Sequence, residues 1–540
     1  FAYGEIEDSH AVLAGTVKGL AQVGGLVGAL ASGPMGNVSV MKAVGVADAD
    51  AMVFGTGEYV GGIGGHLTSS LVMDLTTDVS VQGNSNYVGG AVGYLYGNAG
   101  YSQDYVTPGA SINIHSTGLT VTGAGQQVGG LFGYAIGGNG ATNWSATANV
   151  IGSSQSFIGG LVGKLSAGTY SNLHATGDSV VGGPYAGGLV GYFDGSSIDN
   201  ASAIADVTSS HDYAGGLIGR SQGAISNVSA TGDVLGVTNY VGGLIGHQAN
   251  GSVTGASATG SVTQSNGGNY NYVGGLIGRN EGSTADATAT GDVLGSSYVA
   301  GLVGYSSGNL SNSQATGDVT GRFDYVGGLV GRQVSNTVSD SSYLGSTVVG
   351  QDYVGGLAGH VDNNGSAVLG SYATATVTAS GDFVGGLVGF LEGDLGDSIS
   401  DQPTARGSLY SYASGDVSGR YDVGGLVGRL GSYASITNSF ASGNVVAQAN
   451  YGGLVGYLTP GATLTNAHYD MANVSLSGFT TGSPDAAVDV TGTITAGGLY
   501  ADQYATWYNG GALDGLSATA TIESYFGVAD DNGVYGLSTI

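Results

Sequence analysis

Two series of aspartates recur at fixed places in a repeating pattern. Oxygen ligands of this kind are what Ca²⁺ prefers in proteins. Aspartate beside glycine is also ordinary in turns, where its carboxylate accepts hydrogen bonds from backbone amides. The spacing therefore leaves turn capping and a calcium site open, and no cofactor is strictly required. The calcium candidates are Asp324, Asp352 and Asp382, and the parallel series is Asp178, Asp206 and Asp233.

A second set of residues follows the copies of a glycine-rich block and alternates between cations and rings. No two Lys or Arg are neighbours in this series, which avoids like-charge repulsion and offers each cation an aromatic face. We expect a cation–aromatic ladder that faces outward or toward a partner. The alternative is a solvated surface on which scarce cations are separated by chance. The members are Lys164, Tyr192, Arg220, His247, Arg279, Tyr305, Arg332, His360, Phe390 and Arg429.

An aromatic residue also precedes most Val-Gly-Gly blocks. Rings aligned in this way predict a stacking ladder. A tyrosine strip that binds carbohydrate is the alternative interpretation. The residues are Tyr59, Tyr87, Phe157, Tyr185, Tyr213, Tyr240, Tyr272, Tyr298, Tyr325, Tyr353 and Phe383.

Catalytic candidates are weak. Carboxylates on parallel strands could in principle cleave glycosides, but a catalytic pair should be singular, whereas these aspartates recur. The neighbouring pair His211 and Asp212 has no convincing nucleophile beside it, and the chain has no HExxH zinc motif. We therefore expect a protein that is not an enzyme.

The elements that position these side chains follow a repeat. Blocks such as VGGLVG occur fifteen times between Val23 and Tyr451, and phrases such as NVSATGD lie between them. Short Val-, Ile-, Thr- and Tyr-rich runs broken by Gly, Asn, Ser and Asp predict strands and turns. A unit of about 30 residues cannot bury its own apolar face, but stacked units can. We expect an all-β fold, a β-solenoid resembling a parallel β-helix, with about fifteen stacked coils.

The doubled glycine of each block has a structural explanation. Glycine permits a tight corner or the close approach of another backbone. A phosphate-binding loop would need a Lys-Ser/Thr ending and a following helix, and the blocks have neither.

Three regions are expected along the chain. Residues 21–460 carry the repeats, residues 1–20 form an N-terminal cap or subunit-contact segment, and residues 461–540 form a C-terminal cap or small β domain. Solenoid ends expose strand edges that must be capped or paired with another chain. We therefore predict a homopolymer that grows through the solenoid ends, because a heterologous contact that does not close generates a filament.

The composition argues against nucleic acid as a partner and against a membrane span. The 540 residues include 107 Gly, no Cys, 38 acidic and only 10 basic residues, which gives a net charge of -28. Such a surface repels nucleic-acid phosphates, and the longest uncharged stretch near the start is too polar for a membrane span. The absence of Cys excludes disulfides and thiolate metal sites. The chain begins with Phe1 and acidic residues follow it, so a targeting segment that has already been removed is one expectation.

The alternation of VGGLVG blocks with phrases such as NSQATGDV resembles the GLUG-motif repeats of large bacterial surface and secreted proteins, including adhesin-like haemagglutinins and some immunoglobulin A proteases. The resemblance covers about Val23 to Leu458. It implies a stalk or passenger segment that is extracellular, either secreted or on the cell surface.

These observations predict an extracellular structural protein, a β-solenoid subunit that assembles head to tail into a surface filament and has adhesion as a further use. A glycan or another cell-surface ligand is the expected additional partner. Two other functions stay open. One is a monomeric adhesin stalk that binds glycans through its tyrosines, and the other is a solenoid enzyme that acts on carbohydrate.

Overall fold

The computed structural model describes most of the chain, which folds into two compact units. The N-terminal unit comprises Phe1–Asn266, Asn271–Ser283 and Ala287–Gly291, and the C-terminal unit comprises Gly267–Tyr270, Thr284–Asp286 and Asp292–Ile540. The described residues are 6–31, 39–47, 51–68, 70–72, 75–96, 114–117, 120–153, 157–265, 271–396, 411–470, 476–477, 487–488 and 494–499.

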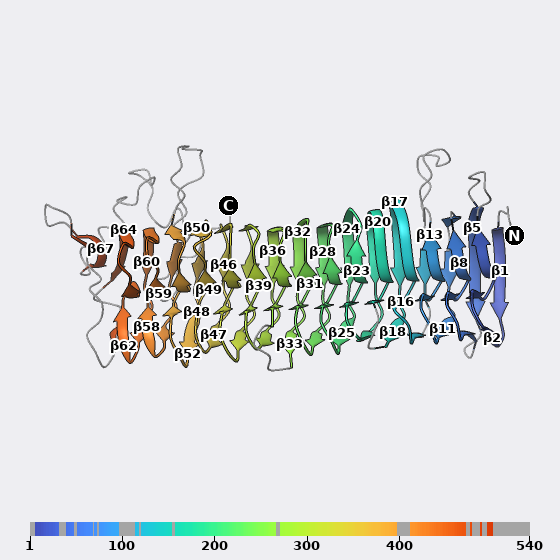
Figure 1. Cartoon of the computed structure of the whole chain (residues 1–540), viewed down its shortest axis with the longest axis horizontal. Helices are drawn as coiled ribbons and strands as arrows, with labels where there is room; N and C mark the ends of the chain where they lie inside the picture. Colours follow the sequence, from blue (N-terminus) through green and yellow to red (C-terminus); the bar gives the residue numbers. More distant parts are fainter. Residues whose placement is uncertain are drawn as a thin grey trace, which may run out of the picture. The chain divides into compact units, whose positions relative to one another are not determined.

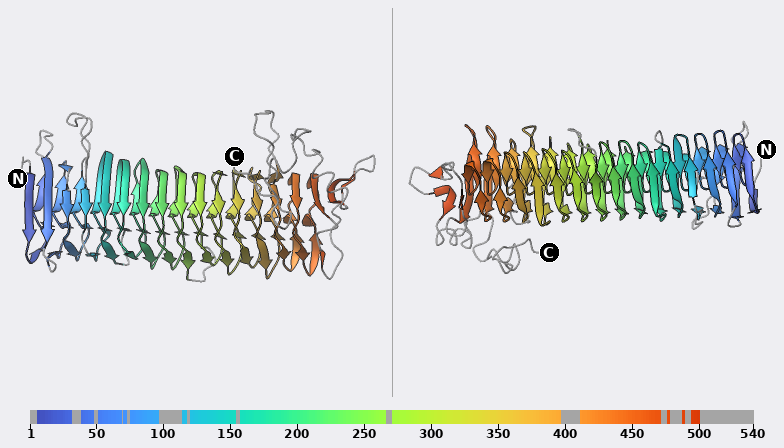
Figure 2. Two further views of the ribbon diagram at one scale, coloured as in Figure 1. Left: turned by 180° about the vertical axis from the view of Figure 1, so that it is seen from behind. Right: turned by 90° about the horizontal axis from the view of Figure 1, so that it is seen from below.

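Each unit is built from coils whose strands pair in parallel with those of the next coil (Figures 1 and 2). Three sheets result. Sheet A contains the longer strands, sheet B the strands centred on a buried valine, and sheet C the short strands of the glycine blocks. One coil of the N-terminal unit consists of β21 (Ser179–Gly182, sheet B), β22 (Ala186–Gly187, sheet C), β23 (Val190–Asp194, sheet A) and β24 (Ser197–Ala203, sheet A).

The register between coils keeps equivalent residues side by side. Strands β25 (Asp206–Ser209), β26 (Ala214–Gly215), β27 (Ile218–Ser221) and β28 (Ala224–Ala230) form the next coil. Val180 pairs with Val207, Ala186 with Ala214, and Ala201 with Val228.

Each sheet C strand marks one coil and coincides with a glycine block of the sequence. In the N-terminal unit these strands are β3 (Val23–Gly24), β7 (Val60–Gly61), β12 (Val88–Gly89), β16 (Gln127–Gly129), β19 (Phe157–Gly159), β22, β26, β30 (Val241–Gly242) and β34 (Val273–Gly274). In the C-terminal unit they are β38 (Val299–Ala300), β43 (Val326–Gly327), β48 (Val354–Gly355), β53 (Val384–Gly385), β58 (Tyr421–Gly424) and β62 (Ala449–Gly452).

The core is a set of aligned apolar columns. The central valine of each sheet B strand and the leucine after each Gly-Gly pair are buried, as Val207, Val234, Leu217 and Leu244 show. Full burial of one such side chain stabilises the fold by roughly 1.5–3 kcal/mol. Since a single coil has nothing to bury these residues against, the stacking itself supplies the core.

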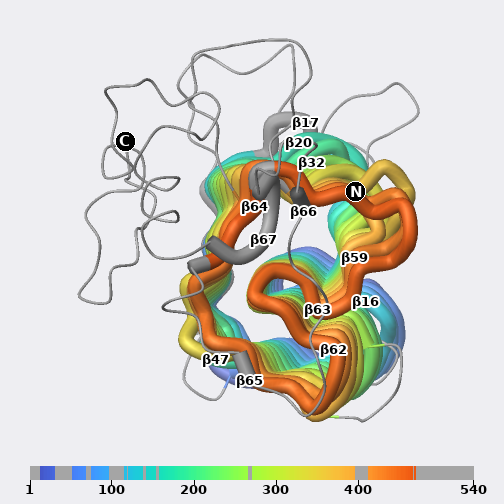
Figure 3. The backbone as a smooth tube through the Cα atoms, turned by 90° about the vertical axis from the view of Figure 1, so that its left-hand side faces the viewer, coloured from blue at the N-terminus to red at the C-terminus, as the bar shows by residue number. Residues whose placement is uncertain are grey.

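The glycine blocks lie where the backbone turns into the interior. Figure 3 shows this inward bend near β62 and β63 (Val455–Leu458). A Cβ on Gly216 would lie 2.1 Å from the carbonyl oxygen of Gly243 in the next coil. Close backbone approach therefore requires glycine here, as the sequence predicted.

The predicted fold class is confirmed. The protein is an all-β parallel solenoid, and its coil count roughly matches the fifteen expected. Within the described residues, no helix is long and apolar enough to cross a membrane.

The sheets extend into both regions expected to flank the repeats. Within residues 1–20, β1 (Ile6–Leu13) pairs with β5 (Ser39–Ala47), and β2 (Thr16–Gly19) pairs with β6 (Met52–Gly55). Beyond residue 460, β64 (Thr463–Asp470) pairs with β60 (Ser435–Ala441) and with β67 (Ile494–Leu499). Residues 501–540, in the expected C-terminal cap, lie outside the described residues.

Candidate functional site

The predicted cation–aromatic series forms one in-register column in each unit, on the sheet A strand that follows each glycine block. In the N-terminal unit the paired neighbours run Tyr134, Lys164, Tyr192, Arg220, His247 and Arg279. In the C-terminal unit they run Tyr305, Arg332, His360, Phe390, Arg429 and Tyr457. We call this the cation–aromatic column.

The cations lie over ring faces, as the alternation predicted. The Lys164 ammonium is 5.1 Å from the ring centre of Tyr134 and 5.3 Å from that of Tyr192. The Arg429 guanidinium is 5.8 Å from Phe390 and 4.9 Å from Tyr457. Each such contact contributes about 0.5–1 kcal/mol at a partly exposed site.

The aromatic residues before the glycine blocks form a second column, here called the tyrosine ladder. Tyr213 stacks on Tyr185 at 4.5 Å and on Tyr240 at 4.7 Å, with interplanar angles of 7° and 2°. In the C-terminal unit, Tyr325 stacks on Tyr298 at 4.6 Å and on Tyr353 at 4.8 Å. The faces that a sugar ring would contact are thus occupied by neighbouring rings, so the geometry favours the stacking interpretation.

Nine ladder residues have a left-handed backbone, with φ between 49° and 66°. This conformation is costly for a bulky residue, and a tyrosine by itself does not indicate it. Asp422 and Asn450 stand at the same place in two later coils with φ of 53° and 51°. Because Asp and Asn tolerate this region, their presence at an otherwise aromatic position was the available signal.

The ion-pair partners of the cation–aromatic column were missed by sequence reasoning. Most of them are acids two residues after a column position, and they contact cations or histidines of the same or the preceding coil, whereas Arg429 lies 3.7 Å from Asp422. Lys164 lies 3.6 Å from Asp194, and Arg279 lies 2.7 Å from Glu281. The acids at the two-residue offset are Asp194, Glu281, Asp362 and Glu392. The fixed two-residue offset was a usable signal, but it occurs in only some coils and is absent from the repeat consensus.

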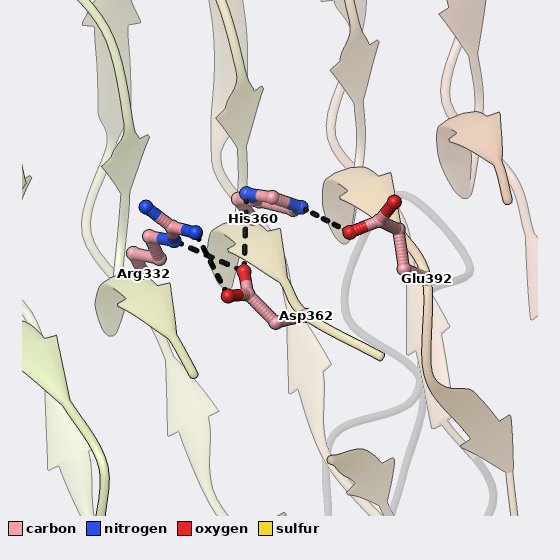
Figure 4. A network of polar contacts seen from close by, with 4 residues as sticks. All are labelled: Arg332, His360, Asp362 and Glu392. Carbon is pink, nitrogen blue, oxygen red and sulfur yellow. Dashed lines mark hydrogen bonds and ion pairs between the residues drawn. The ribbon is translucent and has the colours of Figure 1, made fainter. Parts of the chain in front are cut away.

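One polar cluster in the C-terminal unit brings four of these residues together (Figure 4). Arg332 donates through Nε and Nη2 to both carboxylate oxygens of Asp362, at 3.0 and 2.8 Å. His360 Nδ1 lies 3.3 Å from Asp362 Oδ1, and His360 Nε2 lies 3.2 Å from Glu392 Oε2. His360 is only 6% exposed, and this burial, only partly opposed by the Asp362 charge, lowers the pKa of the imidazole.

His247 is the corresponding histidine of the N-terminal unit and has a simpler setting. Its Nε2 lies 3.5 Å from Glu281 Oε1. Burial lowers its pKa to about 4, and the charges of Arg220 and Arg279 act in the same direction, while Glu281 opposes them. The imidazole is therefore neutral at pH 7.

The three calcium candidates recur one per coil, and each carboxylate has a partner within the protein. Asp352 Oδ1 accepts the backbone N–H of Asp382 at 2.6 Å. Arg420 donates to both carboxylate oxygens of Asp382, at 2.8 and 2.9 Å. Burial and the neighbouring Asp352 charge raise the pKa of Asp324. Among the described residues these acids do not converge, and the calcium site stays a prediction.

The second aspartate series caps turns from one coil to the next. Asp206 Oδ1 accepts the backbone N–H of Asp233 at 2.9 Å, and Asp233 Oδ1 accepts that of Ser261 at 2.8 Å. Asp416 and Asn444 repeat the pattern in the C-terminal unit at 2.8 Å. The turn-capping interpretation thus holds here in a form that also joins adjacent coils.

A parallel β-solenoid with aligned side-chain columns fits a structural repeat protein. Its repeats match the GLUG motif over six segments: residues 182–208, 210–235, 238–263, 269–294, 295–320 and 419–446. The segment 210–235 includes β26, β27 and β28, so one motif corresponds to about one coil. The chain therefore carries GLUG repeats, as the resemblance predicted. No match was found among the curated proteins or the solved structures compared with it.

Proposed function

We propose that this protein is a non-catalytic structural subunit that assembles end to end into an extracellular filament. The observation that carries the proposal is the first coil of the N-terminal unit. Among the described residues, β2 pairs only with β6, and β3 pairs only with β7, so both leave one strand edge free. A free parallel edge is a template for a strand of another chain.

Exposed apolar side chains on the same coil support this proposal. Val12 on β1 is 72% exposed, and Leu20, directly after β2, is 81% exposed. In later coils the neighbouring coil covers much of the apolar surface. A second copy stacked on this coil would cover part of both side chains, which favours association.

The use of the polar residues supports a structural role over catalysis. Asp206, Asp233 and Asp416 bond backbone amides of the next coil, and the cations pair with recurring acids. These groups are committed to coil-to-coil contacts. Assays on polysaccharide substrates are expected to show no turnover, and turnover abolished by one Asp substitution would contradict the proposal.

Electron microscopy of the purified chain tests the assembly. We expect negatively stained wild-type protein to form regular fibres as its concentration rises. The double variant Val12→Lys and Leu20→Lys should stay monomeric, because two charges would replace apolar side chains beside the incoming coil. Leu235→Lys is the matched control, since Leu235 is an exposed apolar residue on a sheet B strand, β29 (Val234–Gly236). Fibres from the double variant, or none from the wild type, would refute end-to-end assembly.

A monomeric stalk that binds glycans is the second candidate, because most tyrosines of the ladder are half-buried at the surface. Their edges, rather than their faces, are left for a ligand. Binding of monomers to a glycan array, lost in Tyr213→Ala, would favour this candidate. Extracellular location is tested by labelling intact cells with an antibody, and the calcium prediction by melting with and without a chelator.

A further inference from the structure

The cluster around His360 has the composition of a metal site. One ligand atom each from His360, Asp362 and Glu392 lies within 4.8 Å of the others. His360 and Asp362 are buried, whereas Glu392 is 39% exposed at the side chain, so the cluster is open to solvent on the side of Glu392. A nitrogen ligand beside carboxylates suits Zn²⁺ and related ions better than Ca²⁺.

Only one of the two imidazole nitrogens of His360 has a hydrogen-bond partner. When Nε2 carries the proton, it donates to Glu392 Oε2 at 3.2 Å. The other nitrogen, Nδ1, then lies 3.3 Å from Asp362 Oδ1, which is also an acceptor. Nδ1 makes no hydrogen bond, although it is buried. Two buried acceptors this close together are unfavourable, and a cation bound to both removes the conflict.

The spacing fits a specific coordination geometry. Zn–N and Zn–O bonds of about 2.1 Å, meeting at the tetrahedral angle, place the two ligand atoms about 3.4 Å apart. The observed separation of Nδ1 and Oδ1 is 3.3 Å. A ligating histidine usually donates its other N–H to a carboxylate, which is the place of Glu392 here. We propose that His360 Nδ1 and Asp362 bind a Zn²⁺-class ion, with Glu392 orienting the imidazole or joining as a third ligand.

Neighbouring side chains fix the positions of His360 and Asp362. The His360 ring is parallel to that of Phe390, with centres 5.0 Å apart and an interplanar angle of 4°. Asp362 is fixed by Arg332, and its oxygens keep further lone pairs beside those used by the guanidinium. With Glu392 as a third ligand, a bound ion would join the coil of β49 (Ala358–Val361) to that of β54 (Val388–Leu391).

Arg332 contacts the cluster through Asp362, and its positive charge opposes metal binding. Replacing Arg332 tests whether its charge weakens metal binding. Tyrosine is the native residue one coil earlier in the same column, at Tyr305, so Arg332→Tyr should preserve the stacking. We expect it to bind Zn²⁺ about tenfold more tightly than the wild type, since the competing charge is gone.

Calorimetric titration of the untagged full chain with ZnCl₂ tests the proposal. The wild type should bind one equivalent more than His360→Phe, a substitution that the column accommodates at Phe390. His247→Phe should bind like the wild type, because the position two residues after His247 is Ala249 and offers no carboxylate. Glu392→Gln should bind about tenfold more weakly, as loss of an orienting carboxylate does elsewhere. CaCl₂ should neither bind this site nor displace zinc.

Circular dichroism checks that each variant keeps its β structure, and Asp362→Asn provides a second loss-of-ligand variant. Equal zinc stoichiometry in the wild type and His360→Phe would overturn the proposal. Absence of saturable zinc binding by the wild type would do so as well. Because neither outcome concerns strand edges, the filament proposal would be unaffected.

Discussion

At the scale of single residues, one column position accepts Lys, Arg, His, Tyr and Phe. What these side chains share is a long or flat apolar body that packs on the ring before it, while the polar end reaches an acid or solvent. Lys164 and Arg332 satisfy this requirement through an acid of the next coil. The histidines satisfy it as neutral rings.

The buried histidine predicts an acid-sensitive fold. His247 takes up a proton near pH 6.5 when the chain is unfolded, but only near pH 4 when it is folded. Its contribution is therefore neutral above pH 6.5 and destabilises the fold progressively as the pH falls toward 4. We expect His247→Phe to lose less stability than the wild type over this range, by up to about 3 kcal/mol. Urea unfolding at pH 7.5 and at pH 4.5 measures the difference, and parallel losses in both proteins would contradict it.

The close backbone contacts at the doubled glycines predict that one added methyl group destabilises the fold. In Gly216→Ala the new methyl group would lie 2.1 Å from the carbonyl oxygen of Gly243. Because this oxygen belongs to the backbone, it can move away only at a high cost in free energy. We expect a loss of about 1–3 kcal/mol or more, measured as a lower melting midpoint. Gly15→Ala is the control, because nothing lies within 4 Å of a Cβ there. Equal midpoints for the two variants would show that the close approach is absent.

At the scale of the elements, the tyrosine ladder combines a strained backbone with a favourable stack. Each ring pair adds roughly 0.5–1.5 kcal/mol beyond burial, which offsets a left-handed conformation costing of order 1–3 kcal/mol. The turn before each glycine block is therefore held by contacts between coils. A coil taken alone would not keep it.

Substitutions at Tyr213 separate the two contributions. Tyr213→Phe keeps the stack and should match the wild type. Tyr213→Asn loses the stack but tolerates φ of 66°, and Tyr213→Ala loses the stack and keeps the strain. We expect destabilisation to increase in the order Phe, Asn, Ala, with Ala costing about 1–3 kcal/mol. Chemical denaturation measures the order, and an alanine variant as stable as phenylalanine would contradict it.

The sequence allowed the columns to be predicted because their spacing is local and repeated. The position after each glycine block placed Lys164, Tyr192 and Arg220 together, and the structure has them in register. The acids could not be found this way. Asp362 contacts Arg332, which is thirty residues away in the sequence. An acid that occurs in only some coils does not appear in the pattern that all repeats share.

At the scale of the whole molecule, one rule accounts for both units: what a residue contacts is its own equivalent one coil away. Stability should then be the sum of coil energies and nearest-neighbour terms. The net charge of -28 is compatible with this arrangement because many carboxylates accept backbone amides or pair with scarce cations. Electrostatic repulsion is thereby relieved locally, without requiring a large positive partner.

Cysteine pairs test the stacking most directly, because the chain has no natural Cys. Val181 and Thr208 are solvent-facing partners on adjacent sheet B strands. Their Cα atoms should lie about 4.8 Å apart, within the roughly 4.4–6.8 Å that disulfides span. Under mild oxidation, V181C/T208C should form an intramolecular disulfide, whereas V181C/D206C, offset by two residues to about 8 Å, should not. Efficient crosslinking of the offset pair, with none in the register pair, would contradict the stacked solenoid.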